Sequence, residues 1–529
     1  MKYGCEPPDP IRFFVTIIPA LLALAAFAGS ANADDLATMD VTTLRALDST
    51  LTGGGILVAQ AEALDSTNLP AFEINPAAVG EPESFFAWIS TNGAYTNYPN
   101  AAGTESGHAE TVGLNIFGAS EGVAPGIEHL DNYEADYFYQ YIIVTNLPIP
   151  DSVVNQSFAF FEDPTNEPPI DSAYDNYIAT NGNILSSAVN GLNDGVGPPG
   201  TAYNCIGVGA YGVNAVVTTG PTPDNGRSKP DIVAPGFETS FTIPYVTGAA
   251  AVLLQAAARG DGGSATTNAA DRRTVKALLL NGALKPFDWS HAANAPLDTR
   301  YGAGVLNLFR SYQQLAGGRQ TCTASNSVAS GAAHPPVSGL GTIASPLGWD
   351  FETITTPPQQ DAIYHYLFNP ATNSTFTATL VWERQAGLTN INQLALFLYD
   401  ASSGALLASS VSPVDNVQHL YIPLLQPGAY DLEVVKYGGV SQSLTPSEMC
   451  ALAFEFYPVA PPLLTVSISA TSTVLTWPAS PTVFTLQQTP NLSPPVSWTD
   501  ATVQQWLTNN SVWVNVDASS GTSFYRLTL

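Results

Sequence analysis

Ser240 is the residue whose surroundings most clearly suggest chemistry. It lies in residues 238–244 (ETSFTIP), directly before an Ala-rich stretch that predicts a helix. Pro244 is compatible with this expectation, because proline is tolerated in the first turn of a helix. The positive end of a helix also favours negative charge developing on a nearby oxygen. A serine at a helix start is most often only a cap, however. A nucleophilic role therefore requires a base and an acid elsewhere in the chain.

The sequence around Ser240 resembles the nucleophile region of the subtilisin-like serine proteases (subtilases). Residues 229–236 (KPDIVAPG) are similar to the KPDIxAPG strand of that family, and residues 239–248 (TSFTIPYVTG) to its G-T-S-x-x-x-P-x-V-x-G helix start. The resemblance implies that Ser240 is a peptidase nucleophile. Two departures stand beside it: Glu238 replaces a glycine, and Phe237 alone replaces a longer loop.

The resemblance also implies the partners of Ser240, which follow the chain order acid, histidine, serine. Residues 107–113 (GHAETVG) are similar to the helix start that carries the histidine, which makes His108 the predicted general base. Residues 53–62 (GGGILVAQAE) are similar to the strand that ends in the family's aspartate, and here Glu62 holds that position. A carboxylate there would accept a hydrogen bond from imidazole Nδ1. Asp65 is the competing acid.

Two further segments resemble the oxyanion site and the substrate wall of the family. Residues 184–191 (ILSSAVNG) place Asn190 where a side-chain amide would hold the tetrahedral oxygen, together with the Ser240 N–H. Residues 153–160 (VVNQSFAF) occupy the place of the strand that pairs with extended peptide. Ala159, Phe160 and Val189 stand where the family has glycines, and their bulk predicts a narrowed substrate pocket. The predicted substrate-binding residues are Ser157, Phe158, Ala159, Ala188 and Val189.

Short buried strands alternating with helical segments must position these residues. Residues 55–59, 152–155, 183–186 and 205–209 read as strands, and residues 246–258 and 273–281 as helices. This alternation predicts an α/β domain with a mostly parallel central sheet. From Trp349 onward, strand-like segments recur between turn signals and predict two all-β sandwich modules.

The predicted organisation has five parts. They are a signal peptide over 1–33, a subtilisin-like peptidase domain over 34–318, a linker over 319–348 rich in Ser, Ala, Gly and Pro, a jelly-roll-like β-sandwich over 349–457, and a small β module resembling immunoglobulin or fibronectin domains over 463–529. The apolar run 13–28 follows Lys2 and Arg12, and Ala31-Asn32-Ala33 fits a signal-peptidase site. We therefore expect cleavage after Ala33, a secreted or cell-surface product, and no membrane insertion of the mature form.

Charge and cysteine content narrow the partners. The chain has 529 residues with 16 basic and 44 acidic side chains, a formal charge of −28. We expect no nucleic-acid binding, because phosphate contacts need clustered cations and the chain has few. After loss of Cys5, an odd number of three cysteines allows one disulfide at most, for which Cys322 and Cys450 are a candidate pair. The oligomeric state is left open.

Two functions from different classes follow. The first is a secreted serine endopeptidase that acts on protein or peptide through Glu62, His108 and Ser240. The alternative is an inactive chain of the same fold that serves as an extracellular binding or structural module. No metal ligands can be assigned from the residues. The resemblance allows Ca²⁺ as a cofactor, but no D-x-D-x-D loop occurs, and Gln393 and Ala395 replace both aspartates of the family's N-D-L-D-L motif in the jelly-roll region.

Overall fold

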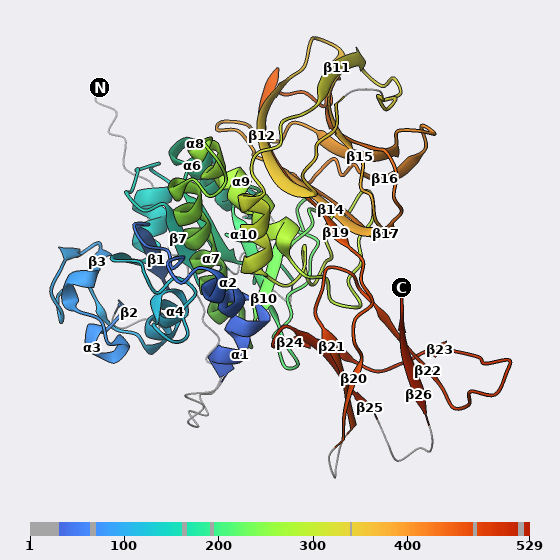
Figure 1. Cartoon of the computed structure of the whole chain (residues 1–529). Helices are drawn as coiled ribbons and strands as arrows, with labels where there is room; N and C mark the ends of the chain where they lie inside the picture. The colour runs from blue at the N-terminus through green and yellow to red at the C-terminus, as the bar shows by residue number, and fades with distance from the viewer. Residues whose placement is uncertain are drawn as a thin grey trace.

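The structure is a computed structural model that describes residues 31–63, 70–160, 167–190, 195–338, 341–468, 473–516 and 523–529. The N-terminal part is an α/β domain, and the C-terminal part consists of two β-sandwiches (Figure 1). The two sandwiches lie on the same side of the α/β domain, one beyond α9 and α10 and the other beyond β10 and α1 (Figure 1). The predicted fold class is confirmed.

An eight-stranded sheet forms the centre of the α/β domain. All neighbouring strands are parallel except the edge pair β3–β4, which is antiparallel. The spatial order is β10 (Ile232–Pro235), β9 (Ile206–Tyr211), β8 (Ile184–Ala188), β7 (Val153–Gln156), β1 (Val58–Glu62), β6 (Leu130–Glu134), β3 (Phe86–Ser90) and β4 (Gly93–Tyr95). Six of these strands are buried at every position, as expected for a sheet covered on both faces: β1, β6, β7, β8, β9 and β10.

Helices cover both faces of this sheet. On one face lie α4 (Gly107–Phe117), α7 (Thr239–Arg259) and α9 (Arg272–Gly282), whose apolar residues share a core with Val58 and Val153 of the sheet. On the other face, α6 (Glu167–Asn181) and the π-helical turn η2 (Phe138–Ile143) pack against Ala59 and Val154. The remaining helices of the domain are α1 (Ala31–Thr38), α2 (Val41–Leu47), α3 (Pro76–Val79), η1 (Glu83–Phe85), α5 (Ala135–Tyr137), α8 (Thr266–Ala269) and α10 (Leu308–Ala316). A small parallel pair, β2 (Ala71–Glu73) and β5 (Thr104–Glu105), precedes α4.

Helix α7 is the central helix of the domain. Within the described part of the chain it is the one helix long and apolar enough to cross a membrane, yet 83% of its most apolar window is buried inside the protein. Its small residues permit this packing. A Cβ added at Gly248, for example, would lie 2.8 Å from Val123 Cβ.

Two buried carboxyl groups lie near the amino ends of β6 and β7. Among the described residues, neither carboxylate oxygen of Asp151 has a hydrogen-bond donor, and its neighbour is the carboxyl group of Asp131. Burial, reinforced by the charge of Asp131, raises the pKa of Asp151 to about 8. Because this folded-state pKa is above the unfolded value of about 3.9, the group stabilises the fold below about pH 4, and that contribution is lost as the pH rises through about 8.

We therefore expect Asp151→Asn to leave the melting temperature unchanged near pH 4 and to raise it by about 3 °C or more at pH 8. Circular dichroism melts between pH 4 and 9 measure this difference. Asp500→Asn, which removes an exposed carboxylate, controls for the change in net charge. Parallel curves for wild type and Asp151→Asn would contradict the assignment.

The first β-sandwich contains two antiparallel sheets. One has the order β11 (Ala324–Ala329), β13 (Gln360–Phe368), β18 (Tyr430–Lys436), β15 (Leu394–Asp400), β16 (Leu406–Ser410), and the other the order β12 (Leu347–Thr355), β19 (Ser447–Pro458), β14 (Ser374–Trp382), β17 (Val417–Leu425). Their facing side chains, such as Leu432 and Phe454, form one core. The second sheet packs on α9 and α10 of the α/β domain.

The second β-sandwich contains a four-stranded and a three-stranded sheet. Their orders are β20 (Thr465–Ile468), β21 (Thr473–Pro478), β25 (Ser511–Val516), β24 (Gln505–Thr508), and β23 (Thr499–Asp500), β22 (Thr485–Thr489), β26 (Phe524–Thr528). The β24–β25 turn contacts the start of the α/β domain. The Asn509 N–H donates to Thr38 Oγ1 (2.7 Å), and Asn510 Nδ2 donates to Asp40 Oδ1 (2.8 Å).

Two observations differ from the sequence expectations. The stretch 319–348, predicted to be a linker, contains β11, which pairs with β13 at the sheet edge. Its polar, largely exposed residues satisfy an edge strand as well as they would a linker. The three cysteines of the described chain, Cys205, Cys322 and Cys450, are free thiols, so the Cys322–Cys450 pairing is wrong. Cys450 instead packs into the core of the first sandwich.

Candidate active site

A carboxylate and an imidazole meet at the carboxyl end of β1. Glu62 is the last residue of that strand and is 2% exposed, and its Oε1 pairs with Nδ1 of His108 in a short contact. The second oxygen, Oε2, accepts a hydrogen bond from Gln60 Nε2 (3.2 Å). Gln60 also donates to the carbonyl of Ala109 (3.0 Å), which ties β1 to the helix that carries His108. Both oxygens of Glu62 are therefore fixed.

His108 stands in the first turn of α4. Ser106 caps this helix and accepts from the Ala109 N–H (3.2 Å), which defines where the helix begins. The imidazole is 31% exposed, whereas its carboxylate partner is buried. The ring centroid lies 5.4 Å from that of Phe241, the residue after Ser240. One edge of the imidazole thus faces the buried carboxylate, and the ring as a whole adjoins the first turn of α7.

Ser240 occupies the first turn of α7, and the capping position belongs to Glu238. Because Glu238 makes no side-chain cap hydrogen bond and Ser240 already lies inside the helix, an N-cap role does not explain this serine. The connection from β10 is short. It turns at Gly236, where φ is +153° and an added Cβ would lie 2.7 Å from Thr242 Cγ2. Phe237 follows as a side chain that is 57% exposed.

Reciprocal hydrogen bonds link Ser240 to the end of β7. Ser157 Oγ donates to the Ser240 carbonyl (2.8 Å), and Ser240 Oγ donates to the Ser157 carbonyl (3.3 Å). Asn155 supports Ser157 through Nδ2 (3.0 Å) and itself accepts from Thr247 Oγ1 on α7 (3.1 Å). Helix α7 is therefore hydrogen-bonded to β7 and the residue that follows it at two points, at Ser240 in its first turn and at Thr247 further along the helix.

Asn115 supplies a second support that the sequence did not reveal. It lies on α4, is buried, and donates to the Phe241 carbonyl (2.9 Å). This bond holds the first turn of α7 against the helix that carries His108. Gln60 is the other such support. The signal that could have found Gln60 is its place two residues before Glu62, since side chains two apart lie on the same face of a strand.

Asn190 lies close to the start of α7. Its Oδ1 accepts a hydrogen bond from Thr239 Oγ1 (2.7 Å), which places the amide beside the residue preceding Ser240. With the carbonyl end of the amide held this way, the NH₂ end is left to donate to another oxygen. The N–H groups of the first turn of α7 lie beside it, and such groups attract negative charge.

The predicted substrate-binding residues end or follow two adjacent strands. Ala188 ends β8, and the segment 157–159 follows β7. All five of these side chains, including Val189, are buried. These side chains therefore pack beneath the site, and a peptide would contact mainly the backbone of these segments. Asp65, the competing acid, lies outside the described residues.

The parallel sheet, the helix order and the β-sandwiches behind them define a subtilisin-like domain followed by all-β modules. Residues 121–304 match the family model Peptidase_S8, the subtilase family. The matched region contains Ser240 and Asn190, whereas Glu62 and His108 precede it. The match therefore shows a subtilase-like region within the chain and covers less than half of its 529 residues. No curated protein sequence matches the chain.

Solved structures similar to this chain include two proteases and a β domain. The prenylagaramide maturation protease PagA is 19% identical, with 53% of this chain and 99% of that one covered and a TM-score of 0.36. The serine protease MycP1 of the type VII (ESX-1) secretion system is 16% identical, with 54% and 90% covered and a TM-score of 0.37. The pre-peptidase C-terminal domain of a Bacillus anthracis collagenase is 14% identical, with 26% and 92% covered and a TM-score of 0.14.

Calcium does not fit the motif positions at which the resemblance would place it. Ala395 offers no side-chain oxygen and is fully buried in β15. Gln393, just before that strand, offers one amide oxygen where an aspartate would offer a charged carboxylate. Because Ca²⁺ is bound by six to eight oxygen atoms, several of them from carboxylates, no catalytic or structural step is assigned to calcium there.

Proposed function

We propose that this chain is a secreted serine endopeptidase, exported after cleavage following Ala33, with Glu62, His108 and Ser240 as its triad. The observation that carries the proposal is the contact between Glu62 Oε1 and His108 Nδ1, two residues 46 positions apart. A buried carboxylate that accepts from Nδ1 fixes the tautomer in which Nε2 can accept a proton. The start of α7, where the Phe241 ring lies 5.4 Å from the imidazole, would then present Ser240 to His108.

The proposed reaction begins with rotation of the Ser240 hydroxyl from the Ser157 carbonyl toward His108. Ser240 Oγ attacks the peptide carbonyl carbon while His108 Nε2 takes its proton, and Glu62 stabilises the imidazolium. The negative oxygen is held by the Asn190 amide and the Ser240 N–H. The C–N bond then breaks, with the leaving amine taking the proton from His108. Water hydrolyses the resulting ester by the same proton route.

One observation favours the second candidate, an inactive binding or structural module. In this structure the Ser240 hydroxyl donates a hydrogen bond to the Ser157 carbonyl, and the side chains beneath the site are buried. Hydroxyl rotation about one bond is a small change, and catalytic hydrogen bonds often form only when substrate binds. We therefore place the peptidase first.

A fluorophosphonate probe separates the two functions, because it reacts with an activated serine. We expect the folded wild-type chain to be labelled at one site and Ser240→Ala to be unlabelled. Ser402→Ala, which changes an exposed turn serine of the first sandwich, is the matched control and should label as wild type does. Absence of labelling in the folded wild type, or equal labelling of Ser240→Ala, would establish the second candidate instead.

A further inference from the structure

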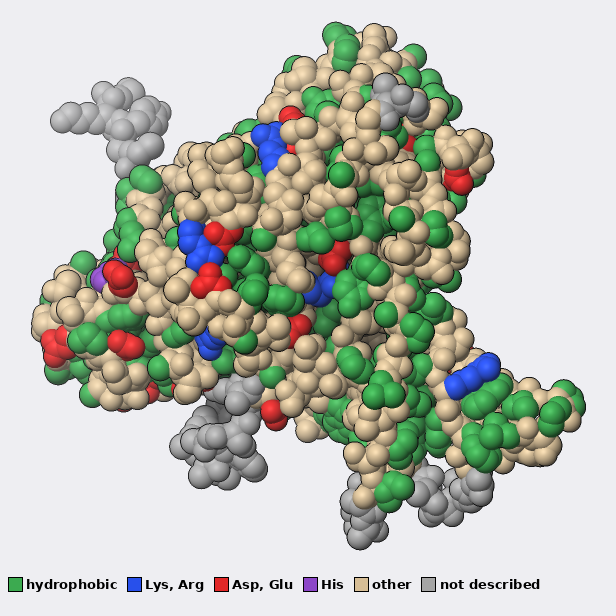
Figure 2. Space-filling view, viewed as in Figure 1, with side chains coloured by type: hydrophobic (Ala, Val, Ile, Leu, Met, Phe, Trp, Pro, Cys, Tyr) green, Lys and Arg blue, Asp and Glu red, His purple; other side chains and the backbone are tan. Residues whose placement is uncertain are grey.

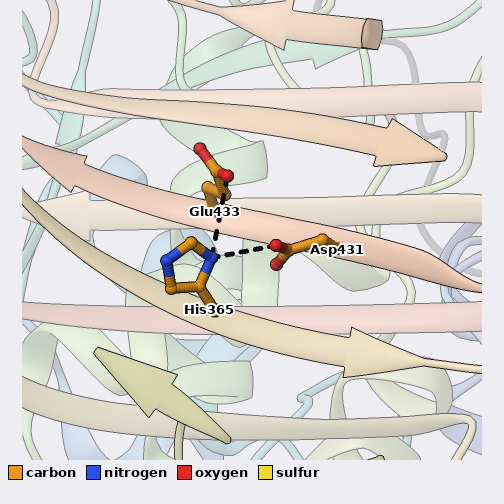
Figure 3. Close-up of side chains that lie close together, drawn as sticks. All are labelled: His365, Asp431 and Glu433. Atoms are coloured by element: carbon orange, nitrogen blue, oxygen red, sulfur yellow. Dashed lines mark hydrogen bonds and ion pairs between the residues drawn. The ribbon is translucent and has the colours of Figure 1, made fainter. Parts of the chain in front are cut away.

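Three ionisable side chains converge within the five-stranded sheet of the first β-sandwich, far from Ser240 in sequence. His365 of β13 lies directly opposite Glu433 of β18 in the strand register, and Asp431 precedes Glu433 by two residues. Since side chains two apart share one face of a strand, all three point to the same side of the sheet. Figure 3 shows both carboxyl groups directed at one nitrogen of the imidazole.

The spacing of these groups is that of ligands around one ion. His365 Nδ1 lies 2.9 Å from Asp431 Oδ2 and 3.6 Å from Glu433 Oε1. One ligand atom from each of the three residues can be chosen so that all lie within 4.8 Å of one another. Bond lengths of about 2.0–2.2 Å in a tetrahedral zinc site place ligand atoms about 3.3–3.6 Å apart. Small side-chain adjustments therefore suffice to bind an ion.

The cluster is buried but not satisfied by the protein. All three side chains are 0% exposed. Both oxygens of Glu433, Oδ1 of Asp431 and Nε2 of His365 have no hydrogen-bond partner among the described residues. Leaving a buried polar group without a partner is costly, and for a charged group the cost is higher. Glu433 in particular is a fully buried carboxylate aimed at the other two groups.

Charge balance points to a cation. In the described chain the only ion pairs of Asp431 and Glu433 are with His365, and neither has a lysine or arginine partner. The neighbouring carboxylate, Asp361, is engaged by His334 (3.2 Å). With both carboxyl groups ionised, even a protonated His365 would leave the three groups with a net charge of −1. A divalent ion with a neutral imidazole and two carboxylates has no net charge.

We propose that His365, Asp431 and Glu433 bind a divalent transition-metal ion of the zinc type, which links β13 to β18. An imidazole nitrogen with two carboxylate oxygens suits Zn²⁺, whereas Ca²⁺ requires more ligands and prefers oxygen alone. The Val337 N–H donates to Asp431 Oδ2 (2.8 Å), an outer contact of the kind that orients a metal ligand. The ion also stabilises the segment that carries Val337. This proposal does not depend on the peptidase activity.

Zinc titration of the full chain tests the proposal. After dialysis against a chelator, calorimetry with ZnCl₂ at pH 7 is expected to show one site, and the melting temperature should rise with zinc concentration. Glu433→Gln should weaken zinc binding by about 100-fold or more, since even loss of an outer contact costs about 10–100-fold. Glu448→Gln, which changes another buried glutamate of the same sandwich, should bind zinc as wild type does. His108→Ala should also retain the site, which separates it from the Glu62–His108 pair.

Three outcomes would overturn the proposal: no zinc binding in the micromolar range, equal binding by Glu433→Gln, or stabilisation by CaCl₂ but not by ZnCl₂. If Glu433→Gln does not fold, the wild-type chain decides the matter through Co²⁺. A visible d–d spectrum of tetrahedral type, together with anomalous scattering located at His365, supports the site. Anomalous scattering elsewhere in the molecule rejects it.

Discussion

Replacement of Glu62 by glutamine is expected to lower kcat by about 10⁴-fold while the chain stays folded. The carboxylate now accepts from His108 Nδ1, whereas an amide can turn its NH₂ group toward that nitrogen. The imidazole would then carry its proton on Nε2, where it cannot accept the proton of Ser240. The imidazolium would also lose its nearest negative charge. Glu62→Asp keeps the charge but shortens the side chain, so a smaller loss of about 10–100-fold is expected.

Steady-state hydrolysis of a peptide library, with the preferred substrate then used for kcat and KM, measures this effect. Glu134→Gln is the matched control. Glu134 lies directly opposite Glu62 in the strand register, but its carboxylate accepts from the Asp136 and Tyr137 N–H groups. An amide oxygen can keep one of those two contacts, and neither contact involves His108, so activity should stay within a few-fold. If Glu62→Gln retains more than a tenth of the activity and Asp65→Asn does not, then Asp65 is the acid.

Replacement of Arg310 by methionine is expected to lower the free energy of unfolding by about 3–5 kcal/mol. Arg310 on α10 pairs with Glu455 on β19, and both side chains are less than a tenth exposed. Without the guanidinium, the one hydrogen bond that the described residues still give the Glu455 carboxylate is from Gln314 Nε2 (2.8 Å). A buried charge left in this way costs more than the ion pair had contributed. The α/β domain and the first sandwich are destabilised together because the pair joins them.

Urea unfolding followed by tryptophan fluorescence measures this loss. Arg310→Met combined with Glu455→Met should recover most of the stability, because no charge then remains unpaired. Arg259→Met removes an arginine that is 36% exposed and paired with Asp48 and Asp261, and should cost less than about 1 kcal/mol. A double variant as unstable as Arg310→Met alone would show that lost packing, not the unpaired carboxylate, is the cause.

The sequence was most informative where local pattern and burial coincide. The strand predicted at 183–186 is β8, and the helix predicted at 246–258 lies inside α7, because a covered parallel strand and a core helix both need continuous apolar runs. The pairing of Glu62 with His108 was predicted from the resemblance of residues 53–62 and 107–113 to two family motifs. Motif order also predicted that these residues act with Ser240, whose neighbour Phe241 lies against the His108 ring.

Other features could not be predicted because they depend on contacts between distant segments. Nothing near Asn115 indicates that it supports a residue on another helix. The cluster of His365 and Asp431, 66 residues apart, follows from the register of two strands, which composition does not fix. The edge strand β11 was hidden because its polar residues satisfy either interpretation. In each case the missing information is which distant segments contact one another in the folded chain.

The surface has few positive charges, consistent with the acidic composition. Figure 2 shows only scattered lysine and arginine side chains on the face drawn, without a basic patch. Several arginines are instead buried in ion pairs, among them Arg227 with Asp171 (2.7 Å) and Arg384 with Asp175 (2.7 Å). The basic side chains thus serve largely to neutralise buried carboxylates.

The hydrogen bonds of Asn509 and Asn510 to the first helices have a consequence for how the chain reaches its native state. They join positions 471 and 470 residues apart, so they can form only after the chain has been synthesised as far as Asn509 and Asn510. Closing so long a loop slows folding, since its entropy must be lost before these contacts form. A chain stopped before β24 would leave Thr38 and Asp40 without these partners. The second sandwich can therefore dock on the first helices only after translation has passed β24.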